Sequence, residues 1–383
     1  MKISYFFHDV GHADLARRCG MLREGGAETM VFGFRRTQQT EADLAEAVVD
    51  LGRTADARFL QRIWSVARAI PRLRQWADKL RSSNVILARN LEMLVLAAVA
   101  RRLHAPRAAL VYECLDIHRL MLTNHLGGVI LRRLERMLLN HCQGLMVSSP
   151  AFIREYFQPI HRALPRTFVV ENKVFPADET GVASEEILGS GPPWRIGWFG
   201  VLRCRRSLEM LSLLLRSAPG MFEVIVAGVP ATGVFEGNEK AFAGISGLTF
   251  LGAYNGEAAH ARLFRSVHFI WAIDYYDAGG NSNWLLPNRL YRAALYGAVP
   301  VTLAGVETGK WLACYNAGIL LDEPAEEQLL ATMRNITPQS FSAAKAAIER
   351  IPKTALITQA GECKDLVVSL GELGRSFGES GKQ

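Results

Sequence analysis

At 383 residues the chain is about two to three times as long as a typical domain, so we expect two domains. Hydrophobic residues make up 49% of it and charged residues 21%, a balance that excludes a disordered chain and predicts ordinary hydrophobic cores. The formal net charge of +7 favours phosphate-bearing partners, but no nucleic-acid-binding module is recognisable, and we expect no nucleic-acid partner.

The N-terminus and the cysteines are typical of a cytoplasmic protein. His8 and Asp9 interrupt the first apolar run before it reaches the length of a secretory signal. The most apolar helix candidate, residues 93–100, is bounded by charged residues and is too short to cross a bilayer. The six cysteines are scattered without a Cys-x-x-Cys pair, which argues against a disulfide framework and against structural zinc. We therefore expect a soluble or peripheral protein.

Strands and helices are predicted to alternate in two runs, which is the pattern of two doubly wound α/β domains. The predicted boundaries are 1–175 for the first domain, 176–194 for a linker rich in Gly, Pro and Ser, and 195–345 for the second domain. Residues 346–383 are predicted to form helices that cross back to the first domain and end in a polar tail. The predicted strands are 2–7, 29–34, 84–88, 108–113, 144–148 and 167–171, then 195–200, 222–228, 248–251, 267–273, 299–303 and 318–321.

A polar turn with His8, Asp9 and His12 follows the first predicted strand. Parallel sheets place their ligands at the carboxyl ends of their strands, so these side chains are candidates for binding a substrate. The alternative is structural, with Asp14 capping the following helix. The turn has no GxGxxG motif, which argues against a dinucleotide site of the dehydrogenase kind.

Residues 58–81 are basic and carry Trp64, Leu73 and Trp76 at helical spacing, with Pro71 expected to break the helix. This composition suits the surface of an anionic membrane. A helix pair that packs its apolar side on the sheet explains it equally well.

Two further loops follow predicted strands, and we expect both to face the cleft between the domains. Arg89 and Asn90 lie in the first of them, and Glu113, Asp116 and His118 lie at the second. Asp116 is either a functional carboxylate or the cap of the next helix. The helix that contains residues 131–136 is predicted to be a solvated structural element.

The second domain opens with a strand, Gly200 and a group of three arginines, Arg203, Arg205 and Arg206. A glycine turn lets backbone approach a phosphate, and arginines neutralise it, so this order favours phosphate binding. The alternative is a surface patch of positive charge.

A glycine-rich turn and a helix complete the candidate site. Asp274 and Asp277 precede the turn Gly279-Gly280-Asn281. A helix is predicted to begin near Asn288 and to end at Gly297, before the buried strand 299–303. Its amino end suits a diphosphate, and Arg289 and Arg292 project from its first turn. On periodicity alone, the helix is equally well explained as an amphipathic helix with solvated arginines.

The string Pro287-Asn288-Arg289-Leu290-Tyr291, followed by Gly297 and Pro300-Val301, resembles the Pro-Asn-Lys-Leu-Phe-Glu…Gly-x-Pro-Val segment of GT-B glycosyltransferases. The likeness is strongest to glycosyltransferase family 4, and there to bacterial exopolysaccharide enzymes of the succinoglycan glucosyltransferase kind. The chain departs from the family in two places. Arg292 stands where the family has the Glu that holds the donor ribose, and one extra residue separates Gly297 from Pro300.

The resemblance implies a GT-B fold, with two Rossmann-like domains facing across a cleft. It implies transfer of a hexose such as glucose from a UDP-sugar to a lipid-linked saccharide, at the cytoplasmic face of the inner membrane, with possible contact through 58–81. Asp116 would accept the acceptor's proton in an inverting reaction, with His118 beside it and Glu113 in reserve. Cations and helix ends would stabilise the diphosphate, so no metal and no cofactor are expected. The implied donor residues are Gly200, Arg203, Arg205, Arg206, Asp277, Gly279, Gly280, Asn281, Asn288, Arg289 and Arg292, and the implied acceptor residues are His8, Asp9, His12, Arg89 and Asn90.

Two other functions stay open on the sequence. Arg292 in place of the family's Glu permits a catalytically inactive GT-B subunit that binds a nucleotide or glycan and supports a partner enzyme. A sugar-nucleotide epimerase on the same fold would convert the donor without any acceptor.

Overall fold

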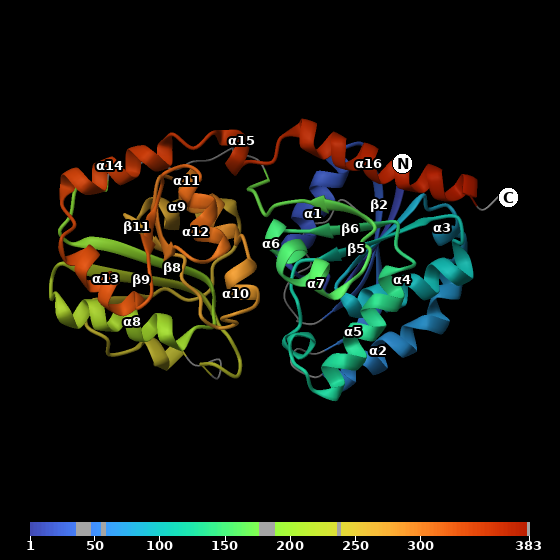
Figure 1. The fold of residues 1–383 in the computed structure, drawn as a ribbon, viewed down its shortest axis with the longest axis horizontal. Coiled ribbons are helices and arrows are strands. Elements are labelled where there is room, and N and C mark those ends of the chain that lie inside the picture. Colours follow the sequence, from blue (N-terminus) through green and yellow to red (C-terminus); the bar gives the residue numbers. More distant parts are fainter. Residues whose placement is uncertain (36–46, 55–58, 176–187, 236–238, 381–383) are drawn as a thin grey trace. The chain divides into compact units, whose positions relative to one another are not determined.

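The structure is a computed structural model that describes residues 1–35, 47–54, 59–175, 188–235 and 239–380. The chain divides into two compact units (Figure 1). Unit 1 comprises Met1–Glu171 and Gln359–Gln383, and unit 2 comprises Asn172–Thr358. The chain thus returns to unit 1 after completing unit 2. Of the predicted linker, residues 176–187 lie outside the described residues.

Unit 1 is built on a seven-stranded parallel sheet of order β3-β2-β1-β4-β5-β6-β7. Its strands are β1 (Lys2–Phe7), β2 (Glu28–Arg35), β3 (Ala47–Arg53), β4 (Val85–Arg89), β5 (Ala109–Cys114), β6 (Gly144–Val147) and β7 (Arg166–Val169). The central strands are apolar and buried throughout, as expected of parallel strands covered on both faces. The doubly wound prediction is confirmed for this unit. The edge strand β3, which alternates buried and exposed residues, was not predicted.

Helices cover both faces of this sheet. Helices α1 and α16 lie together on one face, where a Cβ at Gly25 would collide with the Cys363 carbonyl. Helices α2, α4 and α5 cover the other face (Figure 1). The helical segments of unit 1 are α1 (Ala13–Glu24), α2 (Phe59–Arg72), η1 (Leu73–Trp76), α3 (Ala77–Arg81), α4 (Leu91–His104), η2 (Arg119–Leu122), α5 (Leu126–Leu139), α6 (Pro150–Phe152), η3 (Ile153–Phe157), α7 (Gln158–Ile160) and α16 (Ala360–Ser380).

Unit 2 is a six-stranded parallel sheet of order β10-β9-β8-β11-β12-β13. Its strands are β8 (Trp194–Leu202), β9 (Phe222–Pro230), β10 (Leu248–Phe250), β11 (Phe269–Trp271), β12 (Val299–Leu303) and β13 (Ile319–Leu321). Its helical segments are α8 (Arg205–Ser217), η4 (Glu239–Phe242), α9 (Glu257–Arg265), α10 (Asn281–Trp284), α11 (Asn288–Leu295), α12 (Glu307–Ala313), α13 (Ala325–Arg334), α14 (Pro338–Glu349) and α15 (Lys353–Leu356). The second doubly wound prediction is also confirmed.

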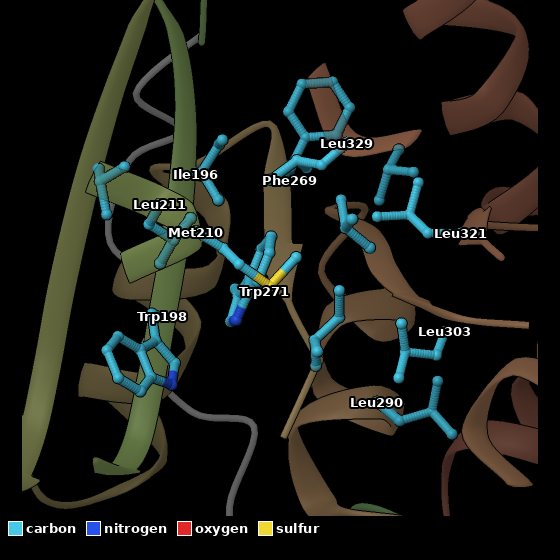
Figure 2. Packing of buried hydrophobic residues seen from close by; sticks show 14 of the residues in the cluster. Ile196, Trp198, Met210, Leu211, Phe269, Trp271, Leu290, Leu303, Leu321 and Leu329 are labelled. Atoms are coloured by element: carbon cyan, nitrogen blue, oxygen red, sulfur yellow. The ribbon is translucent and has the colours of Figure 1, made fainter. Parts of the chain in front are cut away.

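The core of unit 2 follows from the alternation of side chains along β8 and β11. Trp198 and Trp271 point to the face where Met210 and Leu211 of α8 pack against them (Figure 2). Their neighbours Phe199 and Ile270 point to the opposite face and contact Phe264 of α9. Each large side chain buried in this way stabilises the unit by about 1.5–3 kcal/mol relative to exposure.

The strand orders locate one topological switch point in each unit. In unit 1 the connections diverge between β1 and β4, and in unit 2 they diverge between β8 and β11. Open α/β sheets bind ligands beyond the carboxyl ends of the strands at such points. Within the described residues no helix has both the length and the apolar character needed to cross a membrane.

Candidate functional site

An ion pair spans the switch point of unit 2. Arg203 follows β8 and Asp274 follows β11, so the two side chains leave the sheet at adjacent strands. Nε of Arg203 donates to Oδ2 of Asp274 at 3.0 Å, and Nη2 lies 2.9 Å from the same oxygen. The carboxyl edge of this sheet therefore carries a fixed charged group where a ligand is expected.

A second arginine approaches the same carboxylate. Nη2 of Arg289, in the first turn of α11, lies 4.0 Å from Oδ2 of Asp274. Burial raises the pKa of Asp274, but the charges of Arg203 and Arg289 outweigh that effect and hold it below its usual value. Burial lowers the pKa of Arg289, and Asp274 opposes the shift. Two guanidinium groups thus face one carboxylate, and the group has a net positive charge.

A small cavity adjoins the three charges. Its volume is about 50 Å³, which is room for one or two water molecules. The hydroxyl of Thr302 in β12 lines it and, within the described part of the chain, has no hydrogen-bond partner. A buried polar group without a partner is costly, so this hydroxyl is available to a ligand or to water. The polar lining consists of Arg203, Asp274, Ser282, Arg289, Thr302 and Thr308.

Local sequence explains why Arg289 lies there. Helix α11 begins at Asn288, as predicted, after the extended residue Pro287. Leu290 and Tyr291 are buried in the core, which turns Arg289 toward the sheet's carboxyl edge. Gly297, with φ of +77°, then adopts the left-handed conformation that ends the helix.

The glycine-rich turn uses its backbone donors internally. The N–H of Asp277 donates to Ser282 Oγ at 2.9 Å, and the N–H of Gly279 donates to Asn283 Oδ1 at 2.7 Å. The N–H of Gly280 donates to the Asp277 carbonyl at 3.0 Å. Asn281, at the start of α10, is buried. These four predicted donor residues therefore shape the turn in this structure.

The other predicted cations of unit 2 have different partners. Arg206 donates from Nε to Glu326 at 2.7 Å and stacks on the ring of Tyr275. Arg205 is exposed and lies over the ring of Phe235. Gly200, with φ of +113°, pairs with Gly228 of β9. A Cβ at Gly228 would collide with the Gly200 backbone. Of the arginine group, only Arg203 lines the cavity.

Arg292 forms an ion pair that the sequence did not predict. It donates to Glu257, the first residue of α9, through Nε at 3.3 Å and Nη2 at 2.9 Å. Tyr296 also donates to Glu257, at 2.9 Å. Glu257 precedes Arg292 by 35 residues, and no motif connects them.

In unit 1 the predicted acceptor residues lie at the switch point between β1 and β4. His8 Nδ1 and Asn90 Nδ2 are 3.4 Å apart, which brings the two loops together. Asp9 accepts from the N–H of Gly11 at 3.2 Å. The cap of α1 is His12, whose Nδ1 accepts from the N–H of Asp14, so the alternative role suggested for Asp14 is wrong.

Arg89 and Glu113 belong to a buried network. Arg89 is 3% exposed and donates from Nη2 to Asp14 at 2.8 Å. Glu113 is fully buried and accepts from Arg18 Nε at 2.8 Å and from the Tyr5 hydroxyl. Burial raises the pKa of Glu113, but Arg18 and Arg89 outweigh it and keep the group ionised. Glu113 has no exposed surface for a substrate, so the structure gives the predicted reserve base a structural position.

Asp116 and His118 follow β5 and are both exposed. His118 Nδ1 accepts from the N–H of Leu120 at 3.3 Å and caps η2. The cap is therefore His118, and Asp116 is not needed in that role. Across the described chain, no three His, Cys, Asp or Glu side chains gather as a metal site would require.

Comparison with known proteins gave one close relative and many structural neighbours. No protein-family model matches the chain. The succinoglycan biosynthesis protein ExoL of Rhizobium meliloti (strain 1021) is 37% identical over 378 residues, covering 97% of this chain and 94% of ExoL. Sucrose-phosphate synthase from Thermosynechococcus elongatus has a TM-score of 0.66 at 11% identity, covering 100% of this chain and 98% of its own. Anabaena HepE, solved with UDP-glucose, has a TM-score of 0.62 at 14% identity over 99% of both chains. At such low identity these structures establish the fold alone.

Proposed function

The chain belongs to the family of the succinoglycan biosynthesis protein ExoL and has the GT-B fold, and we propose that it is a glycosyltransferase of bacterial exopolysaccharide assembly. It transfers a sugar, a hexose such as glucose, from a UDP-sugar to a lipid-linked saccharide. HepE supports the donor class, because a protein of this fold has been solved with UDP-glucose.

The observation that carries this proposal is the pair of arginines at the unit 2 switch point. Transfer from a nucleotide sugar leaves a diphosphate, and its developing charge must be stabilised. Arg203 and Arg289 are aimed at one oxygen position, within 3.0 and 4.0 Å of it. The amino end of α11 lies beside them, and the helix dipole favours negative charge at that end. Cations and a helix end thus perform the role that a metal has in other transferases.

Asp116 is the proposed base for the acceptor hydroxyl. It is an exposed carboxylate at the carboxyl end of β5, whereas Glu113 is buried against Arg18. A carboxylate there, with His118 two residues away, is suited to accept a proton from a sugar hydroxyl. His8 and Asn90, which meet at the neighbouring switch point, are proposed to bind the acceptor saccharide.

A lipid-linked acceptor requires contact with the membrane, and the exposed side chains of η2 and α5 provide a suitable surface. We define this basic–apolar surface by its members: Arg119, Leu120, Leu122, Leu126, Ile130, Arg133, Arg136 and Met137. Leu126 is 77% exposed, and Ile130 and Met137 are each 54% exposed. Apolar side chains beside arginines are suited to an anionic bilayer.

The charge of residues 117–140 favours an anionic membrane as the partner of this surface. Residues 117–140 contain one acidic side chain, Glu135, and it is fully buried. The predicted segment 58–81 is different, because several of its apolar residues, among them Val66, Ala69 and Leu73, are buried in its own unit. Trp64 in the same segment is 67% exposed. Membrane contact is therefore proposed through η2 and α5.

Transfer assays with radiolabelled UDP-glucose and a bacterial lipid-linked saccharide fraction test the function. The enzyme should move label to the lipid fraction, and Arg203→Ala should abolish most of it while the protein stays folded. Arg216→Ala, an exposed arginine at the far end of α8, is the matched control. UDP binding without transfer would favour the inactive subunit, and donor conversion without acceptor would favour the epimerase.

A further inference from the structure

The contacts of Arg203 with Asp274 restrict how its guanidinium group can bind a donor phosphate. A guanidinium group binds phosphate best through two adjacent N–H groups on one edge. The Nε–Nη2 edge of Arg203 is already used, because Nε donates to Oδ2 of Asp274 at 3.0 Å and Nη2 lies 2.9 Å from the same oxygen. A phosphate oxygen that binds this edge must take the place of that carboxylate oxygen.

The same oxygen also faces the second arginine. Arg289 Nη2 lies 4.0 Å from Oδ2, so one carboxylate oxygen is placed between the two guanidinium groups. The other oxygen, Oδ1, accepts from the backbone N–H of Tyr276 at 2.9 Å. The side chain of Asp274 is 9% exposed. Backbone and burial therefore hold the carboxylate in the position that an anionic ligand of these arginines would occupy.

The space left beside these groups is small. The adjoining cavity of about 50 Å³ has room for one or two water molecules, which is less than a diphosphate needs. The donor's phosphates thus need the arginines to release Asp274, or need Asp274 to turn away. Either movement exchanges one anion for another at the same two cations.

We propose that Asp274 is a positioning residue whose carboxylate occupies the diphosphate position of the empty site and is displaced when the donor binds. This inference rests on the proposed function, since it assigns the donor phosphates to Arg203 and Arg289. Asp274 keeps the two arginines together in the ligand-free protein, and it weakens donor binding by competing for them. Removing its charge should therefore lower stability and raise affinity at once.

Isothermal titration with UDP, and separately with pyrophosphate, tests the exchange. Asp274→Asn should bind UDP more tightly than the unmodified protein, by about tenfold. The thermal unfolding midpoint of the ligand-free variant should be lower, because two partly buried arginines then lack their counter-charge. Pyrophosphate affinity should rise by a similar factor, since the gain arises at the phosphates.

Asp322→Asn is the matched control. Asp322 is an exposed carboxylate just after β13, at the same edge of the sheet, so its removal changes the net charge equally. Its UDP affinity should rise far less. Asp274→Glu, which keeps the charge, should restore affinity toward that of the unmodified protein and guards against misfolding of the Asn variant.

The outcomes separate the two proposals. UDP binding that is unchanged or weaker in Asp274→Asn, with binding intact in the unmodified protein, would overturn the exchange and leave the donor site standing. Equal gains in Asp274→Asn and Asp322→Asn would also overturn it, because the effect would then be general charge. Absence of UDP binding in every folded variant would overturn the donor site itself.

Discussion

Arg292 and Glu257 are joined by two parallel hydrogen bonds, from Nε at 3.3 Å and from Nη2 at 2.9 Å. They bring the first turn of α9 against α11, and the hydroxyl of Tyr296 donates to the same carboxylate. The position where related sequences are expected to have a Glu thus holds an arginine, and a carboxylate from another helix lies beside it.

Exchange of the two charges tests this relationship. Arg292→Ala leaves the partly buried Glu257 without its cationic partner and should reduce the free energy of unfolding by about 1 kcal/mol. The double exchange Arg292→Glu with Glu257→Arg should recover most of that loss, and urea unfolding measures both. Arg334→Ala, which removes an exposed arginine at the end of α13, should have a smaller effect. A double exchange no more stable than Arg292→Ala would contradict a paired role.

The pH dependence of stability gives an independent check. Burial raises the pKa of Glu257, but the hydrogen bond and charge of Arg292 outweigh it and lower the pKa in the folded protein. A lowered folded pKa means that the pair's contribution is complete above the unfolded pKa, about 4.3, and disappears as the pH falls through the folded pKa. The stability difference between the unmodified protein and Arg292→Ala should be constant from about pH 6 to 8 and should shrink below about pH 4. A difference that persists at the acid end would point to packing instead.

The sheets could be predicted because their strands are uninterrupted apolar runs. Such runs can be recognised in the sequence without knowing which strands pair. The sequence prediction missed β3, since Ala47–Arg53 exposes every second or third residue, as an edge strand does. It took residues 131–136 for a solvated helix. That interpretation was wrong for Glu135, which is buried and accepts from Tyr112 and Tyr156, 23 and 21 residues away. Burial of a charged residue is decided by partners that local patterns do not reveal.

The candidate site has the same limit. Composition and spacing identified Arg203 and Arg289 as cations near a helix end, because strand, glycine, arginine and helix follow one another locally. They did not identify Asp274 as the partner of both, since it lies 71 residues from Arg203 and meets it only when β8 and β11 become neighbours. Arg206 pairs with Glu326, which is 120 residues away. This tertiary pairing, which local sequence did not reveal, holds Arg206 away from the site.

The proposed base is tested by Asp116→Asn. If Asp116 accepts the acceptor proton, the variant should lose about 10²- to 10⁴-fold in kcat while UDP affinity stays unchanged. Steady-state transfer assays with titration of UDP separate the two effects. Asp78→Asn, an exposed aspartate in α3, serves as the control. Transfer at the normal rate in Asp116→Asn would rule out the residue as the base.

Membrane docking through the basic–apolar surface is tested by vesicle sedimentation. Leu126 and Ile130 occupy successive turns of α5 and are 77% and 54% exposed, so acidic substitutions there should be tolerated by the fold. Leu126→Glu with Ile130→Glu should abolish most binding to vesicles that contain phosphatidylglycerol. Leu103→Glu is the matched control, because Leu103 is an apolar residue of α4 that is 58% exposed and lies outside this surface.

The electrostatic part of docking has its own signature. Binding of the unmodified protein should fall as salt rises, and it should be weak on vesicles of phosphatidylcholine alone, because Arg133 and Arg136 then lack anionic headgroups. Arg133→Glu should weaken binding to anionic vesicles while leaving transfer to a water-soluble acceptor analogue unaffected. If the double Glu variant still sediments with anionic vesicles as the unmodified protein does, η2 and α5 are not the docking surface. Loss of binding in Leu103→Glu to the same extent would show that the effect is general exposure of charge rather than this surface.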